Sequence, residues 1–188
     1  MRLVCELDRE RLSAVKAIAM DVDGVLTDGA IIWAPTGPAT ECFEVKVFDV
    51  KDGFAVKWAS RLGLVTAIIT GRLSPAVQQR ARELGITFLV TGCANKREGL
   101  AGVCRQAELS PESVAYIGDD LPDLGALKLA GLGIAVADAV PEVRAAADAV
   151  TAAPGGRGAV REAVEAILRG QGLWEQVVAR SGAPDEGT

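Results

Sequence analysis

The sequence contains no histidine among its 188 residues. The chain therefore cannot use imidazole as a general base, a nucleophile or a metal ligand. Acid–base chemistry would fall to carboxylates, lysines or the single tyrosine, and a metal site would depend on oxygen ligands. Oxygen ligands suit hard cations such as magnesium. The absence of histidine directs the search for a functional site to the acidic residues.

Paired cysteines and long apolar runs are also absent. The four cysteines, Cys5, Cys42, Cys93 and Cys104, form no Cys-x-x-Cys pair, which argues against a zinc site and against disulfides. The charged start "MRLVCELDRERLSAVK" is unlike a signal peptide, and no apolar run approaches the roughly 18 residues of a membrane span. The net charge of −5 argues against nucleic acid or an anionic membrane surface as partner. We therefore expect a cytoplasmic protein that binds neither nucleic acid nor membrane.

Short apolar runs alternate with helical patterns along most of the chain. Strands are predicted at 15–22, 64–70, 87–91, 113–118, 133–137 and 148–151. Helices are predicted at 52–62, 74–85, 95–109, 121–131, 141–147 and 156–170. This alternation predicts an α/β fold, a doubly wound, Rossmann-like parallel sheet with helices on both faces. We expect one domain over residues 1–170 and a flexible tail over 171–188.

An unusual segment interrupts the alternation after the first strand. Runs at 30–35 and 41–48 flank a turn at 36–38, and the second run alternates Phe43, Val45 and Val47 with polar residues. This pattern predicts a β-hairpin with one apolar face. The region 29–48 has room for a hairpin flap but not for a separate cap domain. An exposed apolar face would need a partner, which favours assembly into an oligomer.

Polar side chains gather where the predicted strands end. The segments are "DVDG" with Asp21 and Asp23, "TGR" with Thr70, "NK" with Lys96, and "GDDLPD". Taken alone, each residue is more typical of a helix cap, a strand end or a solvated side chain than of a site. However, ligands of open α/β sheets bind beyond the carboxyl ends of the strands, and four strands deliver polar groups there. The pattern predicts a site at that edge.

These segments resemble the four motifs of the haloacid dehalogenase superfamily. "DVDGVLTD", "IITGR", Lys96 and "GDDLPD" stand in the family's order over residues 18–123. The hairpin, "FDVKDGFAVK" and "GGRGAVRE" resemble the small phosphatases that act on 3-deoxy-D-manno-octulosonate 8-phosphate, which extends the likeness to about residues 15–170. An acid at position 23 is typical of the superfamily's phosphatases and phosphomutases, and argues against dehalogenases and transport ATPases.

The resemblance implies a magnesium-dependent sugar phosphatase of lipopolysaccharide synthesis. Asp21 would be the nucleophile that forms an aspartyl phosphate, and Asp23 the general acid and then the general base. Mg²⁺ would be held by Asp21, by the main-chain carbonyl of Asp23 and by Asp119.

The remaining motif residues have implied supporting roles. Thr70 would donate its hydroxyl to a phosphoryl oxygen with help from the Gly71 amide, and Lys96 would neutralise the nucleophile and the developing charge. Either Asp120 or Asp123 would orient Lys96 or the waters on the metal, and the sequence leaves that choice open.

The substrate is an acidic keto sugar phosphate by the same resemblance. The candidate substrate-binding residues are Gly71, Arg72, Lys51, Asp52, Arg157 and Arg161. Arginines suit a sugar carboxylate through bidentate contact. The family often has arginine where this chain has Lys51, so N-acylneuraminate 9-phosphate or a related nine-carbon sugar phosphate stays an alternative substrate.

The resemblance also implies a homotetramer in which hairpins of several subunits meet. Two readings from other classes remain, a signalling receiver domain and a non-catalytic phosphatase-like assembly module. A receiver domain is not expected to show "DVDG" followed by a late "GDD". A non-catalytic module would be expected to lose Asp21, Asp23 or Lys96, and all three are present.

Overall fold

A six-stranded parallel sheet forms the centre of the protein. A computed structural model of the chain describes residues 2–35 and 42–181. The strand order is β5-β4-β1-β6-β7-β8. The strands are β1 (Ala17–Met20), β4 (Val65–Ile69), β5 (Phe88–Val90), β6 (Val114–Gly118), β7 (Leu132–Ala135) and β8 (Ala149–Val150). The chain winds outward from β1 in one direction and from β6 in the other, so the topology reverses between these two neighbours.

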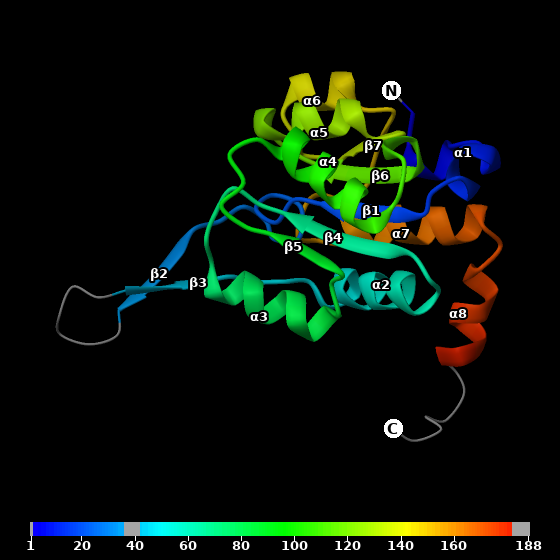
Figure 1. Ribbon diagram of the computed structural model, residues 1–188. Helices are drawn as coiled ribbons and strands as arrows, with labels where there is room; N and C mark the ends of the chain where they lie inside the picture. The colour runs from blue at the N-terminus through cyan, green and yellow to red at the C-terminus, as the bar shows by residue number, and fades with distance from the viewer. Residues whose placement is uncertain (1, 36–41, 182–188) are drawn as a thin grey trace.

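Helices cover both faces of the sheet (Figure 1). One layer holds α2 (Val50–Arg61), α3 (Pro75–Leu84) and α7 (Ala159–Gly170); the other holds α4 (Lys96–Ala107), α5 (Leu124–Leu129) and α6 (Pro141–Ala146). The shorter elements are η1 (Val4–Glu6), α1 (Arg9–Ser13), η2 (Pro111–Ser113) and η3 (Leu121–Asp123). The predicted doubly wound α/β sheet is confirmed. Within residues 2–35 and 42–181, no helix has both the length and the apolar character needed to cross a bilayer.

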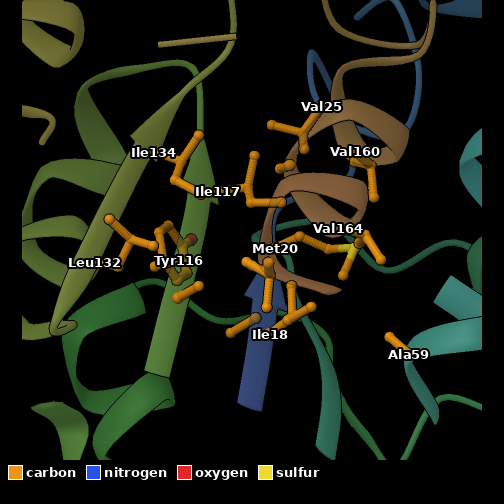
Figure 2. Close-up of a cluster of buried hydrophobic side chains, with 14 of the residues drawn as sticks. Ile18, Met20, Val25, Ala59, Tyr116, Ile117, Leu132, Ile134, Val160 and Val164 are labelled. Carbon is orange, nitrogen blue, oxygen red and sulfur yellow. The ribbon is translucent and has the colours of Figure 1, made fainter. Parts of the chain in front are cut away.

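The core is mainly aliphatic, as the 4% aromatic content of the chain predicts. Every residue of β1, β6 and β7 is buried, because helices cover both faces of these central strands. Figure 2 shows side chains from these strands, such as Met20 and Ile117, in one cluster with Val160 and Val164 of α7. The buried strands thus fix the positions at which the loops beyond their carboxyl ends begin.

The predicted hairpin is formed by β2 (Ile32–Pro35) and β3 (Cys42–Val45), which pair antiparallel with Trp33 opposite Glu44. It projects beyond the sheet, and the described residues between β1 and α2 contain no separate cap domain (Figure 1). The predicted turn at 36–38 lies outside the described residues. The exposed large apolar side chains of this region are Ile31, Ile32, Trp33, Phe43 and Val47.

The chain beyond residue 170 is folded as far as residue 181, so the predicted flexible tail from 171 is wrong for this part. Helix α8 spans Trp174–Ser181, and Trp174 is buried. The Trp174 ring meets Trp58 of α2 edge-on at 5.7 Å, and the Arg161 guanidinium lies 4.5 Å from the Trp58 ring centre and 5.0 Å from that of Trp174. Aromatic burial and cation–π contacts explain why α8 packs on α2 and α7. Residues 182–188 lie outside the described part.

The segment before α7 packs on the loop that follows β1. The Gly156 amide donates a hydrogen bond to the Val25 carbonyl at 2.9 Å. A β-carbon at Gly155 would lie only 1.8 Å from the carbonyl oxygen of Gly24. The paired glycines of "GGRG" therefore allow two backbone segments to touch, and they fix the loop that carries Asp21 and Asp23.

We expect Gly155→Ala to lower the free energy of unfolding by about 1–3 kcal/mol, because the added methyl group overlaps the Gly24 carbonyl. The φ angle of Gly155 is not positive, so the loss would report the overlap and not backbone strain. Gly102→Ala is the matched control: it lies inside α4 with no close contact, and it should be neutral or stabilising by up to about 1 kcal/mol. Denaturant unfolding of both variants measures this, and equal stabilities would contradict the packing role of Gly155.

Candidate active site

Two acidic residues meet where the sheet topology reverses. Asp21 directly follows β1, and Asp119 directly follows the neighbouring strand β6. Carboxylate oxygens of Asp21, Asp119 and Asp123 lie within 4.8 Å of one another. The predicted gathering of acids at the carboxyl edge of the sheet is thus present in the structure.

Lys96 reaches this cluster from the first residue of α4. Asn95 caps the helix by accepting a hydrogen bond from the Glu98 amide. The Lys96 side chain is buried, and its Nζ lies 2.8 Å from Asp21 Oδ2 and 2.7 Å from Asp123 Oδ1. A buried ammonium is costly without partners, so the two carboxylates and the lysine depend on one another.

Asp123 is the organising acid of the cluster. It is fully buried, and it accepts hydrogen bonds from the Tyr116 hydroxyl at 2.6 Å and from the Asp119 and Asp120 amides at 3.1 and 3.3 Å. The carboxylate of Asp120 instead accepts from the Leu121 amide, and Asp120 is exposed. Of the two predicted supporting acids, the structure brings only the Asp123 side chain to Lys96. Tyr116 was not predicted, since a tyrosine within a buried strand has no sequence signal that distinguishes it from core.

The cluster holds more negative than positive charge. Burial, and then the charge of Asp123, raises the pKa of Asp21 to about 6 against the opposing effect of Lys96. Burial, with Asp123 and Asp21, raises the pKa of Asp119 to about 8. Burial alone would lower the pKa of Lys96, but Asp21 and Asp123 outweigh it and raise that pKa. A further cation would therefore relieve the repulsion between these carboxylates.

The residues present fit a hard divalent cation. Asp119 Oδ1 is buried and has no hydrogen-bond partner among the described residues. Gly24 makes room for this carboxylate, since a β-carbon there would lie 2.0 Å from Asp119 Oδ2. Asp123 already accepts several hydrogen bonds, so Asp21 and Asp119 are the acids with oxygen to spare. Two carboxylates with additional oxygen ligands suit Mg²⁺.

Residues 70–72 extend the site beyond β4. Thr70 follows β4, which pairs with β1, and its buried hydroxyl accepts a hydrogen bond from the Arg72 amide at 3.3 Å. The Arg72 guanidinium donates to Glu44 at 2.5 Å and lies 3.7 Å from Asp23 Oδ2. Thr70, Gly71 and Arg72 are thus in the loop next to the one that carries Asp23.

The hairpin contributes two residues that the sequence analysis did not single out. Lys46 forms an ion pair with Asp23 and lies 3.4 Å from Glu44, and only 1% of the Lys46 side chain is exposed. The alternation of polar and apolar residues over 42–47 is the sequence signal for these two residues, because the polar Glu44 and Lys46 face the site. On its own, this alternation predicts a hairpin with an apolar face and does not show what its polar face contacts.

The predicted substrate-binding residues divide into two groups. Lys51 and Arg157 are exposed and line a cavity of about 330 Å³ beside Asp28 and Phe48, and Arg157 lies 3.5 Å from Asp28. Their position leaves the prediction open.

Asp52 and Arg161 make contacts within the protein in this conformation, and their role in substrate binding stays a prediction. The buried Asp52 carboxylate accepts hydrogen bonds from the Gly158 and Arg161 amides at 3.2 and 2.7 Å, and so it caps the start of α7. The Arg161 guanidinium is held between two tryptophans and by Glu165 at 3.1 Å.

Comparison with known proteins gives matches over most of the chain. A family model of haloacid dehalogenase-like hydrolases matches residues 85–162. The 3-deoxy-D-manno-octulosonate 8-phosphate phosphatase of Escherichia coli (strain K12) is 40% identical over 167 residues, which is 89% of this chain and 86% of the relative.

Solved structures agree with this match. The enzyme of the same name from Moraxella catarrhalis, in complex with magnesium ion, phosphate ion and KDO, has a TM-score of 0.87 at 40% identity, over 92% of this chain and 97% of that one. The cobalt-bound deoxy-D-mannose-octulosonate 8-phosphate phosphatase from Haemophilus influenzae has a TM-score of 0.81 at 38% identity, over 87% and 93%. The predicted resemblance is confirmed: the chain belongs to the haloacid dehalogenase-like hydrolases, in the family of the 3-deoxy-D-manno-octulosonate 8-phosphate phosphatases.

Proposed function

We propose that the protein is a magnesium-dependent phosphatase that hydrolyses 3-deoxy-D-manno-octulosonate 8-phosphate through an aspartyl-phosphate intermediate. The observation that carries this proposal is the buried cluster at the reversal of the sheet, where Lys96 holds the Asp21 carboxylate and Asp119 keeps an oxygen without a partner among the described residues. The identity and activity of the relatives support the choice of substrate. The assembled Asp21, Lys96 and Asp119 also argue against a non-catalytic module.

The placement of the side chains supports a reaction in two steps. The Asp21 carboxylate attacks phosphorus, and the bond between phosphorus and the sugar oxygen breaks. Asp23 gives a proton to the departing sugar oxygen. It later takes one from the water that attacks phosphorus of the aspartyl phosphate, and the bond between phosphorus and the Asp21 oxygen breaks to release phosphate and the free carboxylate. Lys96 offsets the charge beside Asp21, and the Thr70 hydroxyl donates to a phosphoryl oxygen. When bound, Mg²⁺ supplies charge that draws the phosphate to the carboxylate.

The proposal includes a homotetramer in the cytoplasm. The hairpin has exposed apolar side chains, and among them Trp33 is 58% exposed and Phe43 is 51% exposed. Large apolar side chains clustered on a projecting element favour contact with another copy of the chain.

Phosphate release from a panel of sugar phosphates tests the substrate. We expect the highest kcat/KM for 3-deoxy-D-manno-octulosonate 8-phosphate, because the exposed Lys51 and Arg157 and the half-buried Arg72 can meet a carboxylate that hexose phosphates lack. One charge-assisted hydrogen bond is worth roughly 1.5–3 kcal/mol, so hexose phosphates should be about ten- to a hundredfold poorer. A preference for N-acylneuraminate 9-phosphate would contradict the eight-carbon substrate and favour the alternative.

The affinity for Mg²⁺ should rise with pH up to about pH 8. The pKa of Asp119 is raised to about 8, so below this pH a proton must leave before the carboxylate can bind the ion. Between pH 6 and 8 the dissociation constant should fall by about tenfold for each pH unit, the value for release of one proton. Isothermal titration calorimetry at several pH values measures this. Asp119→Asn should abolish tight binding, and a dissociation constant that does not change with pH would contradict the assignment.

A further inference from the structure

The hairpin is joined to the catalytic loops by a ring of four alternating charges. Asp23 pairs with Lys46, Lys46 lies 3.4 Å from Glu44, Glu44 lies 2.5 Å from Arg72, and Arg72 Nε returns to within 3.7 Å of Asp23 Oδ2. The members come from the loop after β1, from β3 and the residue after it, and from the loop after β4. With two acids and two bases, the ring has no net charge. Such a neutral ring is the arrangement in which buried charges are tolerated.

Burial separates the members into inner and outer residues. The side chains of Lys46 and Glu44 are only 1% and 8% exposed, whereas Asp23 keeps 22% and Arg72 keeps 39%. Lys46 is therefore covered by protein and does not itself face a substrate in this conformation. Its contact toward the reacting groups is Asp23, whose Oδ1 it holds.

We propose that Lys46 is a positioning residue that orients the Asp23 carboxylate for proton transfer and so makes this step depend on the hairpin. This inference rests on the proposed function, since Asp23 is the proton donor there. With Oδ1 tied to Lys46, the carboxylate cannot rotate freely, and Oδ2, which lies 3.7 Å from Arg72 Nε, is the oxygen left to carry the proton. Glu44 in turn holds Lys46 and Arg72, so the polar face of β3 carries the anchor.

The proposal predicts a loss that depends on the leaving group. A sugar alkoxide needs a proton as it departs, whereas p-nitrophenolate departs without one. Lys46→Met keeps the length of the side chain and removes the ammonium. The ratio kcat/KM reports the steps up to departure of the leaving group and leaves out the later attack of water on the aspartyl phosphate, which both esters share. We expect the variant to lower kcat/KM for a sugar phosphate by about ten- to a hundredfold, at or below the lower end of the range for general acid catalysis, and to lower kcat/KM for p-nitrophenyl phosphate by less than about threefold.

Two further variants separate this role from a structural one. Lys46→Arg should recover a large part of kcat/KM for the sugar phosphate, because a guanidinium can also pair with Asp23. Lys128→Met, an exposed lysine of α5, is the matched control and should change neither rate.

A double-mutant cycle tests whether Lys46 acts through Asp23. In an Asp23→Asn background, adding Lys46→Met should lower kcat/KM for the sugar phosphate by less than about twofold, since a contact already lost cannot be lost again. Losses that multiply, or equal losses of kcat/KM on both esters in Lys46→Met, would overturn the inference while the phosphatase function stands. A wild-type protein that hydrolyses neither ester would overturn the proposed function and, with it, the inference. If Lys46→Met does not fold, Glu44→Gln tests the same anchor and should show the same dependence on leaving group.

Discussion

The carboxylate of Asp123 holds together parts of the chain that are far apart in sequence. It is fully buried, and it binds the Lys96 ammonium, the Tyr116 hydroxyl and the amides that begin the loop after β6. Because Lys96 pairs at the same time with Asp21, the position of this proposed nucleophile depends on the buried Asp123. Removal of one partner from such a set leaves a buried charge uncompensated, so an incomplete cluster would destabilise the fold.

Two other segments complete the support of the loop after β1. The glycine segment before α7 touches the backbone at Gly24 and Val25, and Asp52 of α2 caps the first turn of α7. On the opposite side, Lys46 of the hairpin binds Asp23. Asp21 and Asp23, the proposed nucleophile and proton donor, are thus two residues apart in sequence but are held by different partners, Lys96 for one and Lys46 for the other. This separation allows two neighbouring carboxylates to have different tasks.

The fold and the acids of the site could be predicted because they follow local rules. Buried strands appear as apolar runs, and parallel strands bring their carboxyl ends to one edge, which places Asp21, Thr70 and Asp119 together. Helix α8 could not be predicted, since it depends on contacts of Trp174 with Trp58 of α2, which is distant in the sequence, and with Arg161 of the preceding helix α7. The orientation of the hairpin is equally non-local, which is why Lys46 was missed. Asp52 had the right chemistry for a ligand contact, but its partners are the amides of α7.

The central claim is that Asp21 becomes covalently phosphorylated during turnover. Borohydride reduces an acyl phosphate to the alcohol, so quenching the enzyme during hydrolysis of the sugar phosphate should convert the modified aspartate to homoserine. Mass spectrometry of the digested protein identifies the position. The account predicts homoserine at position 21, dependent on substrate and absent from Asp21→Asn. Turnover without any such conversion, or conversion at Asp23 or Asp119 instead, would contradict it.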